Sequence, residues 1–256
     1  MEEKLAAFGR LLKIMDDLRA GCPWDKEQTL ESLRYLTIEE TYELSDAILE
    51  KDMDGIKKEL GDLMLHLVFY SKIGSETNNF DIKDVLDSIS GKLINRHPHI
   101  FGDVKVANAQ DVSNNWEKIK LTEKDRKSVL DGVPKSLPAM VKAYRMQEKV
   151  RGVGFDWQNP SQVWEKVNEE MTELQDEVKL GDAEKMEAEF GDLLFSLVNY
   201  SRFIGVNPED ALERTNKKFI KRFQYIEEQA REKDRPLTEL SLEQMDAFWD
   251  EAKGKQ

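Results

Sequence analysis

Two sets of acidic residues recur in this sequence with a constant offset between their members. The first set is Glu40, Glu43, Glu59 and Asp62, and its counterparts in the second half of the chain are Glu170, Glu173, Glu189 and Asp192. Residues three apart share one face of an α-helix, so each pair of carboxylates projects from one side of a helix. Converging carboxylates repel one another unless a cation neutralises them. Because all the ligands are oxygens, the pattern predicts two metal sites that bind Mg²⁺ first and Mn²⁺ second.

Each set needs two antiparallel helices joined by a short connection, so that the two pairs can face each other. We expect the connection at Gly55 in the first copy and at Gly181 in the second. The helices that follow, 56–73 and 186–204, are apolar nearly all round, which predicts that they are central and buried. Acidic pairs at the mouth of a buried helix favour a metal site over the simpler interpretation, a solvated acidic helix face.

The repeat defines the organisation of an all-α chain. We expect an N-terminal helical domain at 1–104, a connector at 105–136, and a C-terminal domain with an extra helix at 137–256. Each domain should contain four long helices, placed by hydrophobic periodicity. The predicted helices are 3–20, 29–50, 54–73 and 81–95 in the first copy, then 137–151, 160–179, 183–204 and 208–231, with a tail at 240–253.

Composition restricts the partners and the compartment. A net charge of −13 argues against a nucleic acid polymer or an anionic membrane as the main partner. No apolar run approaches the length of a membrane span. The single cysteine, Cys22, cannot form an intramolecular disulfide and indicates a reducing, cytoplasmic location.

Basic residues in the second half could meet a phosphorylated ligand that is bridged by metal. Lys218 and Arg222 lie four residues apart on one predicted helix, and Lys166 lies four residues before Glu170. The first half has Leu36 where the second has Lys166. The two metal sites are therefore not expected to be equally competent.

Four further motifs accompany the acidic pattern: Cys22-Pro23-Trp24-Asp25, the run 96–102, Val153-Gly154-Phe155-Asp156-Trp157, and the run 245–252. Together they resemble the MazG nucleoside triphosphate pyrophosphohydrolases of the all-α NTP pyrophosphatase superfamily. The resemblance implies two tandem four-helix MazG-like bundles that assemble as a homodimer. It also implies Mg²⁺-dependent hydrolysis of NTPs and dNTPs to the nucleoside monophosphate and pyrophosphate.

The resemblance also assigns roles to single residues, chiefly in the second half. Lys166, Lys218, Arg222 and Trp249 would contact the nucleotide, with Glu170 and Asp192 counted in the same binding set. Our mechanistic hypothesis is that Glu169 or Glu170 orients or deprotonates the attacking water. Lys218 and Arg222 would steady the leaving pyrophosphate.

Two other classes of protein stay open. A helical di-iron carboxylate protein usually needs Glu-x-x-His, whereas Glu59 and Glu189 are followed by Asp at that spacing. A helical scaffold that only binds a partner would show no divalent-metal-dependent chemistry. In a scaffold, replacing Asp192 with Ala would matter only through folding.

Overall fold

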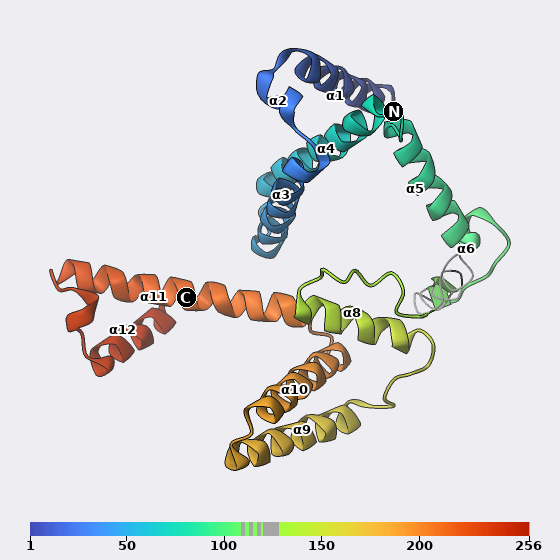
Figure 1. Ribbon diagram of the computed structural model, residues 1–256. Helices are drawn as coiled ribbons and strands as arrows, with labels where there is room; N and C mark the ends of the chain where they lie inside the picture. The colour runs from blue at the N-terminus through green and yellow to red at the C-terminus, as the bar shows by residue number, and fades with distance from the viewer. Residues whose placement is uncertain (109–110, 113–114, 117–118, 120–127, 256) are drawn as a thin grey trace. The chain divides into compact units, whose positions relative to one another are not determined.

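The computed structural model in Figure 1 describes residues 1–108, 111–112, 115–116, 119 and 128–255. These residues contain helices and no strand, which confirms the all-α prediction. They fall into two compact units, Met1–Val112 and Ser113–Gln256. The connector predicted at 105–136 lies partly outside the described residues. No helix in the described part of the chain is long and apolar enough to cross a membrane.

The first unit is built on one antiparallel helix pair. Its helices are α1 (Glu2–Gly21), α2 (Pro23–Glu27), α3 (Leu30–Glu50), α4 (Met53–Glu76), α5 (Ile82–Arg96) and α6 (Pro98–Phe101). Helix α3 packs along α4, and α1 and α5 also contact α4. The buried core comprises Met15, Leu33, Val68, Phe69 and Ile73. It therefore draws on α1, α3 and α4 together.

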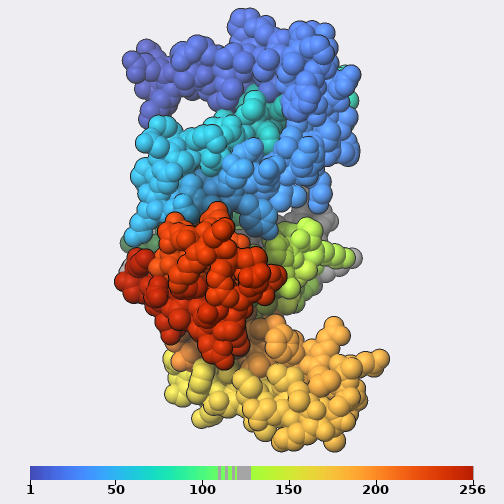
Figure 2. Space-filling view, turned by 90° about the vertical axis from the view of Figure 1, so that its left-hand side faces the viewer, coloured from blue at the N-terminus to red at the C-terminus, as the bar shows by residue number. Residues whose placement is uncertain are grey.

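The second unit repeats this order and adds a C-terminal hairpin. Its elements are α8 (Ala139–Arg151), α9 (Pro160–Leu180), α10 (Ala183–Phe203), α11 (Pro208–Glu232), the 3₁₀ turn η1 (Leu237–Glu239) and α12 (Leu242–Gly254). Helix α9 packs along α10, α8 packs on α10, and α11 contacts α8 and α12. The lobe made by α9 and α10 is coloured yellow and orange in Figure 2. A separate apolar cluster joins α11 to α12 through Ile226 and Phe248.

The predicted helices agree with the observed ones to within about three residues at each end, but one break is placed wrongly. Gly181 ends α9 with a positive φ of 76°, as expected. In the first unit the equivalent residue is Lys51, which adopts the left-handed conformation with φ 58°. Gly55 instead lies inside α4, where its N–H donates to the Oδ1 of Asp52, the capping residue. The side-chain cap of Asp52 decides where the helix begins.

The prediction that 56–73 and 186–204 form helices buried nearly all round is also wrong. One stripe of each helix is exposed in its own unit: Leu60 53%, Met64 40% and Leu67 51% on α4, and Phe190 53%, Leu194 42% and Leu197 39% on α10. The helices that pack against α4 and α10 cover only part of the circumference of each. The two stripes occupy equivalent positions, since their residues correspond one to one in the repeat.

Candidate active site

The second unit brings three of the predicted metal ligands together. Carboxylate oxygens of Glu170 and Glu173 on α9 and of Glu189 on α10 lie within 4.8 Å of one another. Glu170 is buried, with 6% of its surface exposed, whereas Glu173 faces solvent. Partial loss of hydration and the charge of Glu170 raise the pKa of the Glu173 carboxyl. The carboxylates of this cluster therefore repel one another, and a bound cation would reduce that repulsion.

A lysine neutralises part of this cluster. The Nζ of Lys166 donates to Oε1 of Glu169 at 2.8 Å and lies 2.7 Å from Oε1 of Glu170. Residues three and four apart on one helix turn face each other, so α9 alone sets this geometry. The hydrogen bonds to Glu169 and Glu170 raise the pKa of Lys166, which keeps the ammonium charged.

The first unit has an equivalent carboxylate cluster, which is paired with a different lysine. Oxygens of Glu40, Glu43 and Glu59 lie within 4.8 Å of one another. Oε1 of the buried Glu59 accepts from the Nζ of Lys58 at 3.1 Å. Its Oε2 is buried and has no hydrogen-bond partner among the described residues. Burial and the nearby charge of Asp62 raise the pKa of Glu40. A buried oxygen without a partner fits a site that a cation would complete.

The remaining predicted ligands, Asp62 and Asp192, lie outside these groups of three. Asp62 is near enough to influence the charge of Glu40. Asp192 lines a cavity together with Glu170. In each unit the structure therefore brings oxygens of three of the four predicted ligands within 4.8 Å of one another, and the fourth ligand is not in that group.

The cavity of the second unit has a volume of about 600 Å³ and lies between α8, α9 and α10. Three charged residues of the carboxylate region and three aromatic side chains line it: Lys166, Glu170, Asp192, Phe155, Trp157 and Phe195. Ligand sites of this size are commonly apolar with a few convergent polar groups. The cavity thus places an apolar, aromatic space directly beside the carboxylates.

Arg222 and Trp249 form a second group outside the residues that line this cavity, and Lys218 lies four residues before Arg222 on α11. The Arg222 guanidinium lies 5.4 Å from the centroid of the Trp249 ring, and the Phe219 ring lies 5.2 Å from the same centroid. These side chains join α11 to α12, and none of the three predicted nucleotide contacts is among the cavity residues.

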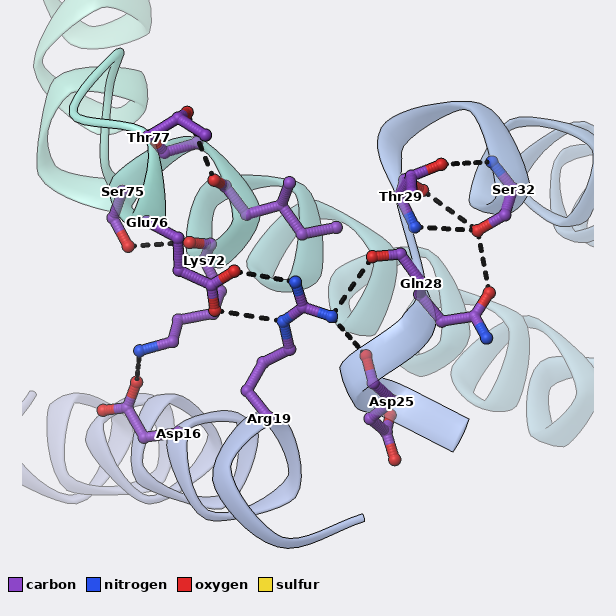
Figure 3. A network of polar contacts seen from close by, with 12 residues as sticks. Asp16, Arg19, Asp25, Gln28, Thr29, Ser32, Lys72, Ser75, Glu76 and Thr77 are labelled. Atoms are coloured by element: carbon purple, nitrogen blue, oxygen red, sulfur yellow. Dashed lines mark hydrogen bonds and ion pairs between the residues drawn. The ribbon is translucent and has the colours of Figure 1, made fainter. Parts of the chain in front are cut away.

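The Cys-Pro-Trp-Asp motif has a structural role in the first unit (Figure 3). Arg19 on α1 donates to Glu76 on α4, with an Nη2–Oε2 distance of 2.7 Å. The same guanidinium donates to the backbone carbonyls of Asp25 and Gln28. One arginine therefore ties α1, α4 and the connection between α2 and α3 together.

The Gly-Phe-Asp-Trp motif is held in a related way in the second unit. Asp156 accepts from Arg202 of α10, with an Nη2–Oδ1 distance of 2.6 Å. Arg151, at the position equivalent to Arg19, lies 3.8 Å from the same carboxylate. Arg202 is 5% exposed in its side chain. The loop that carries Trp157 is therefore fixed to the wall of the cavity.

Sequence reasoning missed Gln147 and Asn199, which line the cavity. A signal for both exists in the repeat. When the two halves are aligned, Gln147 replaces Met15 in the first helix of the unit, and Asn199 replaces Phe69 in the second carboxylate helix. A polar residue in the place of a core residue marks a change of role, and a comparison of the two halves could have found it.

A protein-family model matches both halves of this chain. The model of the MazG nucleotide pyrophosphohydrolase domain matches residues 28–101 and 158–226. The chain belongs to the MazG family. Both matches contain a complete carboxylate set, which confirms the family resemblance and the tandem organisation.

Relatives from three species match over nearly all of this chain. It is 45% identical to the nucleoside triphosphate pyrophosphohydrolase/pyrophosphatase MazG of Thermotoga maritima, covering 99% of this chain and 98% of the relative. It is 42% identical to the nucleoside triphosphate pyrophosphohydrolase of Escherichia coli K12, covering 95% and 96%. It is 50% identical to YabN of Bacillus subtilis, covering 98% of this chain but 53% of that relative.

Proposed function

We propose that this protein hydrolyses NTPs and dNTPs, ATP among them, to the nucleoside monophosphate and pyrophosphate in a Mg²⁺-dependent reaction. The observation that carries the proposal is the cavity of about 600 Å³ that opens beside Glu170 and Lys166. The cavity is large enough for a nucleoside and lies next to a lysine that can bind phosphate and a carboxylate that can bind a metal ion. The names of the Thermotoga and Escherichia relatives support the same reaction.

The donor set fits a hard cation. Each cluster contributes three glutamate carboxylates from two helices, which suits Mg²⁺ and, as a substitute, Mn²⁺. The absence of histidine from these clusters in the described residues disfavours the di-iron alternative. We assign Glu170, Glu173 and Glu189 as ligands, with Asp192 beside them. A bound Mg²⁺ would neutralise triphosphate charge and lower the pKa of a water molecule.

The protein's own residues divide the remaining work. Glu169 is solvent-exposed and shares Lys166 with Glu170, so either carboxylate can take the proton of the attacking water. Lys166 keeps its positive charge beside the carboxylates and attracts phosphate oxygens. Lys218 and Arg222 would steady the leaving pyrophosphate, and Trp249 would contact the nucleotide, in an assembly that brings these residues to the carboxylates, since none of the three lines the cavity of its own unit.

We place the activity chiefly in the second unit. The first unit has Leu36 in the place of Lys166, and Leu36 packs against the hydrophobic core. Its cluster is balanced instead by Lys58, which lies on α4. A metal ion could bind there, but no cation corresponding to Lys166 projects from α3 at position 36 to meet a substrate.

The test is pyrophosphate release from a panel of NTPs and dNTPs, with and without Mg²⁺. Asp62→Ala and Asp192→Ala are matched variants of the two units and are run beside the unmodified chain. We expect Mg²⁺-dependent release that Asp192→Ala abolishes and Asp62→Ala retains. Equal loss in both variants would overturn the site preference. If the folded chain releases no pyrophosphate with Mg²⁺ or Mn²⁺, the proposed enzymatic activity is refuted, and a helical scaffold that only binds a partner becomes the better interpretation.

We also propose a cytoplasmic homodimer that acts on free nucleotides, and not on a nucleic acid polymer or a membrane. The net charge of −13 supports this choice of substrate. The exposed stripe that includes Leu194 and Leu197 supports a second copy as its cover, because such apolar surface is costly in water. Sedimentation analysis should give a dimer that Leu194→Glu dissociates. A monomeric unmodified chain would refute this assembly.

A further inference from the structure

We propose that the cavity of the second unit binds the nucleobase, and that Asn199 and Gln147 read its hydrogen-bonding edge. The inference rests on the proposed function, since it needs a nucleotide whose phosphates lie at the carboxylates. Lys166, Glu170 and Asp192 belong both to the carboxylate region and to the cavity wall. A nucleotide bound there through its phosphates has its base within reach of the rest of the cavity.

The cavity supplies surfaces that suit a flat aromatic ligand. Phe155 and Trp157 come from the loop after α8, and Phe195 comes from α10. Stacking on aromatic side chains stabilises any base, because every base presents a π-face. The ion pair between Asp156 and Arg202 holds the loop in place, so Trp157 does not depend on substrate for its position. Stacking alone gives affinity without choosing among bases.

Gln147 provides an acceptor. The side chain is 4% exposed, and its Nε2 donates to the backbone carbonyl of Phe195 at 2.9 Å. That hydrogen bond fixes the orientation of the amide, so Oε1 points away from the carbonyl of Phe195. The Oε1 atom is buried and makes no hydrogen bond within the described part of the chain. A buried acceptor without a partner is costly, and a donor on a bound base would satisfy it.

Asn199 provides a donor. Its Oδ1 accepts from Nε of Arg202 at 3.2 Å and from Nη2 of Arg202 at 2.7 Å. Because Arg202 is itself paired with Asp156, the asparagine oxygen is held in one direction. The amide nitrogen makes no hydrogen bond to any described residue. An amide with its oxygen engaged presents its N–H groups to the ligand.

In the first unit, core side chains occupy the positions equivalent to the two amides. At the equivalent positions stand Met15 and Phe69, which are 1% and 2% exposed and belong to the hydrophobic core. His66 stands where the second unit has Ser196 and donates to or accepts from Thr37 at 2.9 Å. Two apolar core side chains are thus replaced by amides, and a buried histidine is replaced by the smaller serine. Such replacement costs core stability and is expected where a ligand takes the vacated volume.

The cavity thus offers one acceptor and one donor, from two amides with restricted orientations. Each nucleobase offers a donor beside an acceptor, but the order and the spacing differ from base to base. A site that hydrogen-bonds its substrate discriminates more strongly than a purely apolar one, since mismatched polar groups stay unpaired. The two amides therefore make hydrolysis depend on the base.

The test compares kcat/KM for ATP, GTP, CTP and UTP among variants of the full chain. Asn199→Leu and Gln147→Met remove the amides, and Asn199→Asp turns a donor into an acceptor at nearly constant volume. Asn168→Leu is the control, because Asn168 is exposed on α9 outside the cavity. We expect Asn199→Leu and Gln147→Met to lower kcat/KM at least about tenfold for the best base and to narrow the spread among bases. Asn199→Asp should change the order of preference.

The outcomes separate this inference from the proposed function. Release of pyrophosphate by the unmodified chain, with base preferences that follow the amides, supports both. An equal loss for all four bases, or no loss in the folded variants, shows that the amides only pack and overturns this inference alone. An unmodified chain that hydrolyses no nucleotide overturns the proposed function and this inference with it.

Discussion

The Nζ of Lys166 lies 2.7 Å from Oε1 of Glu170, and both groups belong to the wall of the cavity. In the first unit the same positions hold Leu36 and Glu40, and the balancing cation is Lys58 on the other helix. The side chain of Lys58 is 69% exposed, whereas that of Lys166 is 36% exposed. The two units thus balance equivalent carboxylates with lysines in different locations, and Lys166 lines the cavity of the second unit.

Replacing Lys166 with Leu, the residue of the first unit, should lower kcat/KM about tenfold to a hundredfold. A charged hydrogen bond to a phosphate is lost, which corresponds to about 1.5–3 kcal/mol. Steady-state kinetics with Mg²⁺ measures the change. Lys179→Leu is the matched control, since Lys179 makes a similar exposed ion pair with Asp176 on the same helix. Equal effects of the two variants would contradict a role for Lys166 at the site.

Adding Mg²⁺ should raise the Tm of the second unit, because an ion that binds only the folded state stabilises it. Glu189→Gln removes one charge from the cluster of Glu170 and Glu173. We expect this variant to have a higher Tm than the unmodified chain without metal, since repulsion is relieved. It should also lose most of the Mg²⁺-induced increase. Calorimetry with Mg²⁺ and with EDTA tests both statements, and an unchanged response to Mg²⁺ would argue against this ligand set.

Mg²⁺ affinity should rise with pH over the acidic range. The pKa of Glu173 is raised by partial loss of hydration and by the charge of Glu170, so this carboxyl holds its proton to a higher pH than an isolated glutamate. The metal needs the deprotonated form, and protons therefore compete with it as the pH falls. Isothermal titration at several pH values should show proton release on binding. In Glu173→Gln the pH dependence should become weaker, and an unchanged slope would exclude Glu173 as its source.

Asp156→Ala should destabilise the second unit by about 1–3 kcal/mol and raise KM. The substitution leaves the nearly buried guanidinium of Arg202 without its carboxylate and releases the loop that carries Trp157. Urea denaturation reports the free energy of unfolding, and hydrogen exchange at 152–157 reports the loop. A variant with unchanged loop protection would show that other contacts hold Trp157.

Lys218→Ala should reduce kcat/KM by about tenfold if the lysine contacts the leaving pyrophosphate. Lys221→Ala is the control, because Lys221 is an exposed lysine three residues further along α11. Both changes leave the apolar cluster of Ile226 and Phe248 in place, so folding should be unaffected. Similar values of kcat/KM for the two variants would show that Lys218 does not contact the leaving pyrophosphate.

Local patterns in the sequence were sufficient for the helices and for the two carboxylate sets. Helix periodicity and the three-residue spacing are properties of one element, so Glu170 and Glu173 are bound to share a face of α9. Asp52 is a typical helix-capping residue and therefore a local signal for the start of α4, whereas the left-handed conformation of Lys51 has no signal in its residue type. The exposure of Leu194 could not be predicted, because an apolar stripe does not say which neighbour covers it.

The sequence by itself determined the repeat, the all-α class and the acidic residues available for a metal. Only the tertiary structure decided that Gln147 of α8 and Asn199 of α10 meet at one cavity with Lys166 of α9. It also decided that Met15 and Phe69 close the same space in the first unit. The physical reason is that a cavity is a property of three packed helices and depends on the summed volume of side chains far apart in sequence. No pattern within a single helix contains that information.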